Sequence, residues 1–299
     1  MNLIKFIITI VTPSFNQDEF IEETIKSIWS QEGDFNIEHI IADGGSTDDS
    51  VNIIKQYEKL LLSGNYDIKC NGIQLIWWSR ADEGQTAALN EALNISSGDV
   101  LGWINSDDLF YDVLSLQKIK EAFINNCPDI VTGDAVYINT SGNEQGRYNI
   151  IDELNEGFLS KNQLDNLLRI DFIPQPSTFF KSKVFQKIRF DQSCHISMDW
   201  DFWITAYKKG FRFYKVNKII SRMRKHEEAK TYKHGITFFK EKVKIYNKYR
   251  KFGLNYLYSW LMIIYLSLRH NRFMKSIIER ILISLHKVKK VFLKDHLPL

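Results

Sequence analysis

The sequence predicts an α/β fold: a mixed, mainly parallel sheet flanked by helices, followed by a helical C-terminal extension. Short β-branched runs alternate with segments of helical periodicity over roughly the first 110 residues, a pattern typical of right-handed βαβ units. After about residue 125 this alternation loosens, and from about residue 232 the pattern is helical throughout.

The N-terminal half alternates expected strands with expected helices. Each strand run is short and rich in β-branched residues, and each helix run has an apolar side. Pro13 stops the first strand, and Ser46 or Thr47 caps the second helix, whose first turn holds acids. In chain order we expect a strand at 7–11, a helix at 19–30, a strand at 38–42, a helix at 46–62, a strand at 72–78, a helix at 85–95 and a strand at 99–104.

The later part of the chain is less regular. β-branched and aromatic runs predict further strands, and one amphipathic run predicts a helix. The expected elements are strands at 129–138, 176–180 and 211–216 and a helix at 199–209.

The composition is that of a globular protein made in a reducing compartment. Of the 299 residues, 44% are hydrophobic and 25% charged, which excludes wholesale disorder. The three cysteines are scattered and form no CxxC, which excludes a disulfide scaffold and a zinc finger. The apolar start is interrupted by Pro13 and followed by acids, so we expect a buried strand there and no export signal.

The C-terminal tail carries most of the positive charge. Eight Lys or Arg and two acids follow residue 268, a net charge of +6, which leaves −3 for the preceding residues. The apolar run at 254–268 has 15 residues, fewer than the roughly 20 that span a bilayer. The run after it has the spacing of a basic amphipathic helix, which favours an anionic membrane surface. The alternative is a helical cap or a dimer contact.

Polar residues follow all four strands of the N-terminal half. Because parallel strands end at one sheet edge, where open α/β sheets bind ligands, we expect these loops to share a crevice. Ordinary loops also favour such residues, but four polar loops with five acids at one edge indicate a divalent cation or a ligand rich in donors. The loops are residues 12–16, 43–46, 82–85 and 105–108.

Asp107 and Asp108 are the most informative pair. Adjacent carboxylates after a buried strand suit Mg²⁺ or Mn²⁺, which protein carboxylates share with phosphate oxygens. The alternative is that one of them caps a helix near Val113. The sequence has neither GxxxxGK[ST] nor GxGxxG, so no P-loop or dinucleotide fingerprint is expected.

Taken together, these motifs resemble family 2 glycosyltransferases. The likeness continues through Pro-Gln-Pro-Ser-Thr-Phe at 174–179 and Met-Asp-Trp-Asp-Phe-Trp at 198–203, and it ends near His226. The resemblance implies the GT-A (Rossmann-like) fold and transfer of a sugar from a nucleotide donor with inversion. It also implies a GT-A domain over 1–230, with a nucleotide-binding half at about 1–110 and an acceptor half at about 111–230. The helical, basic pattern of the tail predicts a separate C-terminal extension at 231–299.

On the donor side the resemblance assigns nucleotide binding to the loops after the first three strands. Pro13, Ser14 and Asn16 correspond to the segment that lines the nucleotide pocket. Asp43 corresponds to the acid that reads the nucleobase, and Asp82 lies where the family contacts the nucleotide and donor sugar.

The resemblance also implies a metal site. Asp108 and His226 are the expected metal ligands, while Asp107, Gln85 and Arg224 are expected to contact the donor. The sequence reads Ser-Asp-Asp where the family has Asp-x-Asp, which leaves the division of roles between the two acids open. His226 has the alternative of a surface histidine in a charged loop.

Asp199 corresponds to the catalytic base of the family. The expected Glu-Asp reads Met198-Asp199, so Asp201 stays open as a second choice, and an acid favoured by the helix dipole is the structural alternative. Inversion needs one carboxylate to take the proton of the attacking hydroxyl, and a cation to stabilise the departing diphosphate. Trp200 and Trp203 are expected in the core, and Gln175 in a loop that meets donor or acceptor.

The sequence therefore predicts a metal-dependent inverting glycosyltransferase that uses Mn²⁺ or Mg²⁺. We expect transfer of a hexose or N-acetylhexosamine from a nucleotide sugar to a glycan or lipid-linked acceptor in cell-surface polysaccharide synthesis. The expected location is the cytoplasm, peripherally on the inner face of the cell membrane, with a possible homodimer and no nucleic acid. The alternative is a catalytically silent nucleotide-sugar-binding partner of a membrane glycan assembly complex.

Overall fold

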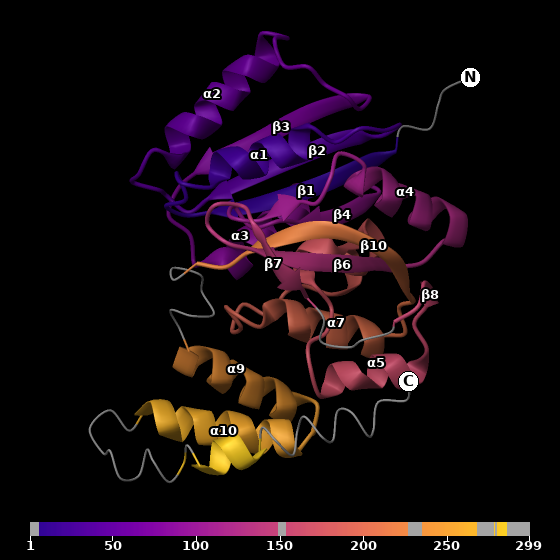
Figure 1. The fold of residues 1–299 in the computed structure, drawn as a ribbon. Coiled ribbons are helices and arrows are strands. Elements are labelled where there is room, and N and C mark those ends of the chain that lie inside the picture. Colours follow the sequence, from indigo (N-terminus) through magenta and orange to yellow (C-terminus); the bar gives the residue numbers. More distant parts are fainter. Residues whose placement is uncertain (1–5, 149–153, 227–234, 268–277, 279, 286–299) are drawn as a thin grey trace.

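The structure, a computed structural model, describes residues 6–148, 154–226, 235–267, 278 and 280–285. It confirms the predicted α/β fold, with helices on both faces of a mixed sheet (Figure 1). The strands are β1 (Ile7–Ser14), β2 (Asn36–Asp43), β3 (Gly72–Ser79), β4 (Val100–Trp103), β5 (Leu109–Phe110), β6 (Ile130–Ile138), β7 (Glu144–Arg147), β8 (Gly157–Phe158), β9 (Thr178–Lys181) and β10 (Phe213–Arg224). The helices are α1 (Ile21–Trp29), α2 (Ser50–Leu62), α3 (Gln85–Ile95), α4 (Ser115–Asn126), α5 (Lys161–Asp165), α6 (Ser182–Lys187), α7 (Met198–Lys208), α9 (Gly235–Lys248) and α10 (Leu254–Ser267).

All described strands belong to one sheet, in the order β3-β2-β1-β4-β9-β6-β10-β5, with β7 beside β6 and β8 beside β10. The four N-terminal strands pair in parallel, whereas β9 runs antiparallel between β4 and β6. The carboxyl ends of β1, β2, β3 and β4 therefore meet at one edge, as expected, and the polar loops lie there.

β1 extends through Pro13 to Ser14, three residues beyond its predicted end. The Val11 carbonyl accepts the N–H of Ile104 on the β4 side, whereas the Ser14 carbonyl accepts the N–H of Gly44 on the β2 side. Pro13 therefore faces the side where β4 has already ended, so its missing N–H leaves no ladder bond unmade.

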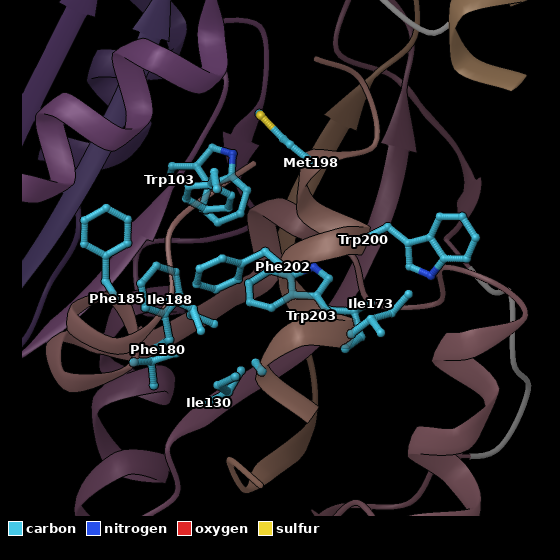
Figure 2. Packing of buried hydrophobic residues seen from close by; sticks show 14 of the residues in the cluster. Trp103, Ile130, Ile173, Phe180, Phe185, Ile188, Met198, Trp200, Phe202 and Trp203 are labelled. Carbon is cyan, nitrogen blue, oxygen red and sulfur yellow. The ribbon is translucent and has the colours of Figure 1, made fainter. Parts of the chain in front are cut away.

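Two apolar clusters hold the layers together. α1, α2 and α4 bury their apolar sides on one face of the sheet, and α3, α6 and α7 bury theirs on the other. In the second cluster Trp103 of β4 stacks on Trp203 of α7, with ring centroids 5.8 Å apart (Figure 2). Trp200 and Trp203 are 1% and 0% exposed, so both belong to the core as predicted.

Other element boundaries also differ from those predicted, and three of them have a clear physical reason. α2 begins at Ser50 rather than Ser46, because the Ser46 hydroxyl is bonded to Asp43 and caps no helix. β10 runs on to Arg224, because β6 and β5 flank its second half and pair with it. β9 begins at Thr178, since the chain before it forms a 3₁₀ turn.

The C-terminal helices add to the layer formed by α3, α6 and α7. α9 packs on the apolar cluster of that layer through Ile245 and Tyr246, and α10 packs beside α9 (Figure 1). Within the described part of the chain, no helix is both long and apolar enough to cross a membrane. The predicted basic amphipathic segment after residue 268 lies almost wholly outside the described residues.

Candidate active site

The ends of β1, β2 and β3 bring Ser14, Asp43 and Ser79 side by side in register. Asp43 is 0% exposed. Its Oδ2 accepts the N–H groups of Gly45 (3.1 Å) and Ser46 (2.9 Å) and the Ser79 hydroxyl (2.6 Å), while its Oδ1 accepts the Ser46 hydroxyl (2.5 Å). The Asp43 carboxylate therefore stabilises the turn after β2. Among the described residues, Oδ1 accepts only the Ser46 hydroxyl, which can rotate.

The loop after β1 continues this surface. The backbone N–H of Asn16 donates to the Ser46 hydroxyl, and the Asn16 side chain accepts the N–H of Thr47. The Ser14 hydroxyl is buried without a hydrogen-bond partner in the described part of the chain. A buried hydroxyl of this kind costs free energy until a ligand or water satisfies it.

Gly44 lies between the side chains of Asp82 and Phe15. A Cβ added there would lie 3.3 Å from Asp82 Oδ2 and 3.4 Å from the Phe15 ring. Phe15 is 59% exposed, a large aromatic ring at the mouth of the site. The Asp82 side chain also accepts the N–H of Gly84 at 2.7 Å and is exposed. Asp43, Asp82 and Phe15 thus border one surface, as the strand order predicts.

Asp107 and Asp108 lie between β4 and the end of β10. Asp108 is 4% exposed, and its carboxylate accepts the backbone N–H of Arg224 at 2.9 Å and the Asn105 side chain at 3.2 Å. Burial raises the pKa of Asp108 well above its usual range, and the neighbouring Asp107 charge adds to this rise. Neither acid caps a helix: the side chain that accepts the N–H of Leu114 ahead of α4 is Asp112.

His226 bonds directly to the acid pair. Its Nε2 lies 2.8 Å from Asp107 Oδ2, and this hydrogen bond raises the pKa of His226. The ring also packs on Phe20. The structure thus brings the predicted metal ligands Asp108 and His226 together with Asp107, the predicted donor contact, and it places His226 in contact with an acid rather than on a solvated surface.

The Arg224 side chain is 0% exposed. Its guanidinium donates to Glu23, to the Asp107 carbonyl and to the carbonyls of Asn139 and Thr140. All of these partners are protein groups, so in this arrangement the guanidinium fixes the loop of the acid pair. Its predicted contact with the donor stays a prediction.

A chain of amide side chains connects α3 to the acid pair. Gln85 Nε2 donates to Asn105 Oδ1 at 2.7 Å, and Asn105 donates to Asp108 and to Gln175. Gln175 is buried and donates to the Trp103 carbonyl at 2.7 Å. Gln85 and Gln175 therefore orient Asn105, whose amide faces the carboxylate that is expected to bind metal.

The next residue of α3 reaches the segment that carries Asp199. The Thr86 hydroxyl lies 2.7 Å from the Cys194 carbonyl and 2.8 Å from Met198 Sδ. The first turn of α3 thus joins the donor side, through Gln85, to the N-terminus of α7, through Thr86.

Asp199 lies half-buried in the first turn of α7, where its Oδ1 accepts the N–H of Trp200. Burial raises the pKa of Asp199 to about 6; the charge of Glu241 adds to the rise and that of Lys242 opposes it. Burial and the charge of Asp199 likewise raise the pKa of Asp171 well above its usual range. A carboxylate poised near neutral pH suits a general base.

Asp201, the second choice for the base, is 3% exposed. Lys248 donates to both of its oxygens, at 2.9 and 2.7 Å, and the Tyr249 hydroxyl donates at 3.0 Å. The Asp201 carboxylate is thus bonded to Lys248 of α9 and to the next residue, Tyr249, which leaves Asp199 as the candidate base.

The acid pair fits a cation that takes few protein ligands. Among the described residues, no three His, Cys, Asp or Glu side chains form a ready metal cage. Mg²⁺ and Mn²⁺ commonly take one or two carboxylates and complete their shell with water and phosphate oxygens. Asp108, which is buried beside a second carboxylate, suits that coordination.

Sequence reasoning missed three residues of this site. Phe15 lies in the predicted polar loop at residues 12–16, but only the structure shows that its ring is exposed at the site. Asp171 and Glu241 lie far along the chain from Asp199 and in no recognisable motif. Only the packing of their segments against the start of α7 brings their charges to it.

Comparisons with known proteins agree with this geometry. The sequence profile described as Glycosyl transferase family 2 matches residues 9–189. An uncharacterized glycosyltransferase of Methanocaldococcus jannaschii is 25% identical over 211 residues, which cover 70% of this chain and 67% of that protein.

Two further relatives match over about a third of their own length. An uncharacterized glycosyltransferase of Mycobacterium tuberculosis is 35% identical over 34% of this chain and 34% of its own. The putative teichuronic acid biosynthesis glycosyltransferase TuaG of Bacillus subtilis is 32% identical over 35% of this chain and 37% of its own.

Solved structures share the fold at low sequence identity. S. aureus TarS 1–349 in complex with UDP-GlcNAc has a TM-score of 0.59 and 16% identity, and the match covers 89% of this chain and 73% of that TarS chain. The mannosyltransferase PcManGT from Pyrobaculum calidifontis, in complex with GDP-Man and Mn²⁺, has a TM-score of 0.57 and 14% identity, with 97% and 76% covered.

Proposed function

Because the chain belongs to glycosyl transferase family 2, we propose that it is a metal-dependent, inverting glycosyltransferase that takes its sugar from a nucleotide donor. The observation that carries this proposal is the role of α3. Its first turn connects the strand-end acids and amides, through Gln85, with the segment of Asp199, through Thr86. An in-line displacement requires a donor site on one side and a carboxylate base on the other, and here the first turn of α3 lies between them.

On the donor side, the loops after β1 and β2 would hold the nucleotide. Among the residues that the structure describes, the Ser14 hydroxyl has no partner and Asp43 Oδ1 is bonded only to a hydroxyl that can rotate away, while the Phe15 ring is exposed. These groups offer a donor, a stacking face and an acceptor for a nucleobase and ribose. Pro13 and Asn16 would shape the loop, and Asp82 would contact the donor beside Phe15.

Asp108, with Asp107 and His226 beside it, would hold the divalent cation. When bound, Mn²⁺ or Mg²⁺ supplies positive charge against the departing nucleoside diphosphate. The protein's own contribution is orientation: Asn105 and the Arg224 backbone fix the Asp108 carboxylate, and the Arg224 guanidinium fixes the backbone of Asp107.

On the acceptor side, Asp199 would take the proton of the attacking hydroxyl. Its raised pKa makes it a stronger base than an exposed aspartate, yet it is still ionised near neutral pH. One carboxylate is sufficient because direct inversion forms no covalent sugar–enzyme intermediate.

A UDP- or GDP-linked hexose or N-acetylhexosamine is the expected donor, and two proteins of similar fold bind UDP-GlcNAc and GDP-Man. The expected acceptor is a glycan or lipid-linked sugar in cell-surface polysaccharide synthesis, and the similar TuaG is named for teichuronic acid biosynthesis. The cytoplasmic face of the membrane is the expected location.

The membrane contact would lie on α10. Leu257, Trp260 and Ile264 are 47%, 42% and 44% exposed and share one face at helical spacing. A net charge of +6 follows them in the chain, so an apolar ridge and a basic segment together suit an anionic lipid surface. The alternative contact for the ridge is a second copy of the chain.

A screen of UDP- and GDP-sugars with Mn²⁺ and simple glycan acceptors tests the proposal through the nucleoside diphosphate released. We expect release from one donor class that a metal chelator stops. Asp199→Asn separates catalysis from silent binding, since a binding partner keeps its function in this variant while an enzyme loses transfer.

A further inference from the structure

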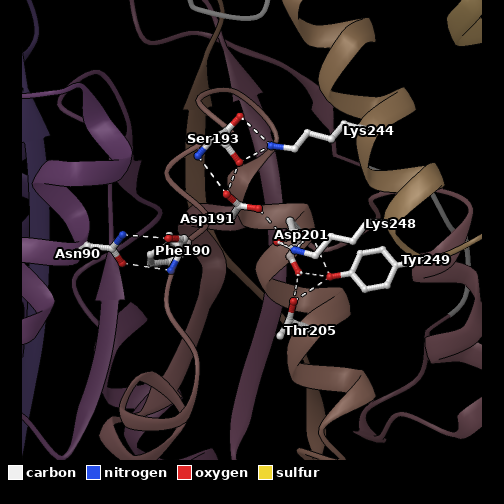
Figure 3. A network of polar contacts seen from close by, with 9 residues as sticks. All are labelled: Asn90, Phe190, Asp191, Ser193, Asp201, Thr205, Lys244, Lys248 and Tyr249. Carbon is white, nitrogen blue, oxygen red and sulfur yellow. Dashed lines mark hydrogen bonds and ion pairs between the residues drawn. The ribbon is translucent and has the colours of Figure 1, made fainter.

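The segment that carries the candidate base is held from outside by α9. Lys244 donates to the carbonyl and hydroxyl of Ser193, while Lys248 reaches Asp191 and Asp201 (Figure 3). These contacts bracket Asp199 on both sides along the chain. α9 lies beyond residues 9–189, so the family match does not include it.

The centre of this contact is Glu241, which is 5% exposed. Its Oε1 accepts the backbone N–H of His195 at 2.7 Å, and its Oε2 accepts those of Ile196 and Ser197, both at 2.9 Å. Three N–H groups on one carboxylate form a strong, charge-assisted contact.

These N–H groups belong to the three residues before the first turn of α7, the last of them its N-cap residue Ser197. Ser197 occupies the N-cap position, but its side chain makes no capping hydrogen bond, and its hydroxyl is buried without a partner in the described part of the chain. Glu241 therefore binds the backbone that leads into α7 rather than the N–H groups of its first turn, and it places a negative charge near the helix N-terminus, where the dipole favours one.

The opposite side of the same segment is tied to the donor half. Thr86 of α3 bonds to the Cys194 carbonyl, one residue before the first N–H that Glu241 accepts. The stretch before Asp199 is thus fixed between α3 and α9, and Asp199 follows two residues after the last of these contacts.

We infer that Glu241 is a positioning residue for catalysis: by binding the N–H groups of residues 195–197, it sets the place and orientation of Asp199 relative to the donor. This inference rests on the proposed function, because Asp199 matters only if it is the base. Both carboxylate oxygens of Glu241 bind backbone N–H groups, so it would act through the position of the chain.

Glu241→Gln tests the inference, with Lys240→Gln as the matched control. Glutamine keeps one carbonyl oxygen but loses the charge and the second acceptor. Lys240 is an exposed neighbour on the same helix, and its replacement also changes the charge by one unit.

We expect Glu241→Gln to lower kcat about tenfold or more while the KM for the donor stays within about twofold, because a small displacement of a base costs rate and not donor binding. Glu241 also interacts electrostatically with Asp199. The other groups that do so are Asp171, Lys242 and Tyr148. The acidic limb of the kcat profile should therefore move down by a few tenths of a pH unit to about one unit. A purely structural role would not move it.

Hydrogen exchange measures the contact itself without any turnover. The amides of residues 195–197 should exchange slowly in the wild type and in Lys240→Gln, and at least about tenfold faster in Glu241→Gln. If the wild type transfers no sugar from any donor, the proposed function fails, and the exchange data still show whether Glu241 holds the segment.

Two outcomes overturn the inference. One is a Glu241→Gln protein with the kcat, pH profile and amide exchange of the wild type. The other is a loss of stability and donor binding throughout the molecule without a shift of the pH limb, since Glu241 would then be a general structural residue.

Discussion

Lowering the pH from 7 to 5 should reduce kcat about tenfold. Burial raises the pKa of Asp199 to about 6 from its ordinary 3.8. The ionised share of this carboxylate therefore falls from about nine-tenths at pH 7 to about one-tenth at pH 5. Only the ionised form accepts a proton from the acceptor hydroxyl, so kcat should follow that share.

The charged groups around Asp199 adjust the pKa that burial raises. Glu241 raises its pKa and Lys242 lowers it, while Asp171 titrates together with it. The acidic limb of the profile therefore belongs to the carboxylate pair rather than to one residue. An unshifted aspartate would stay mostly ionised at pH 5, and the rate would change little.

The assay is the initial rate of nucleoside diphosphate release at saturating donor and acceptor, between pH 4.5 and pH 8 (roughly the range in which carboxylates and histidines titrate). Two Mn²⁺ concentrations that give the same rate show that the metal is saturating at each pH. A flat profile down to pH 5, or a midpoint near 4, refutes the reasoning about Asp199.

Four further predictions concern single substitutions. Asp199→Asn should lower kcat by about 10²–10⁴ with the donor KM within about threefold; an active variant removes Asp199 from the role of base. Asp108→Asn should abolish the rate increase that Mn²⁺ gives and raise the donor KM about tenfold or more, and an unchanged metal response contradicts this. Trp203→Ala should lower the free energy of unfolding by about 3–5 kcal/mol, because the ring is 0% exposed and stacked on its neighbour; a smaller loss in denaturant unfolding means that the core refills the space. Trp260→Ser should reduce cosedimentation with anionic vesicles at low salt, and equal binding by the variant places the contact elsewhere.

The strand-end loops could be predicted because the chemistry is local. A parallel sheet brings consecutive strand ends to one edge, so the sequence alone predicts that the loops of Asp43, Asp82 and Asp108 lie along that edge. The helix at 85–95 was likewise predicted with its observed bounds, since both its periodicity and its flanking polar residues are local signals.

The remainder depends on contacts between distant segments. The second half of β10 owes its conformation to β6 and β5, which flank it. The Ser46 hydroxyl, a good helix cap by type, is used by Asp43, three residues earlier. Residue type predicts that a serine caps something, but only the tertiary structure decides what it caps.

The chain that leads into α7 is the clearest case. Ser197 stands at the N-cap position, and its sequence neighbourhood gives no reason to look further. The group that binds the N–H groups of residues 195–197 is Glu241, 44 residues after Ser197 in the chain. Asp171, whose charge acts on Asp199, is similarly remote in sequence, and its segment is fixed by a hydrogen bond from Trp200 Nε1 to the Leu167 carbonyl.

The central claim is that Asp108 serves the donor and Asp199 serves the acceptor in one site. Titration calorimetry of the nucleoside diphosphate in the presence of Mn²⁺ tests it most directly. We predict equal affinity for the wild type and Asp199→Asn, and at least about tenfold weaker binding for Asp108→Asn. Equal binding by all three proteins would contradict the claim.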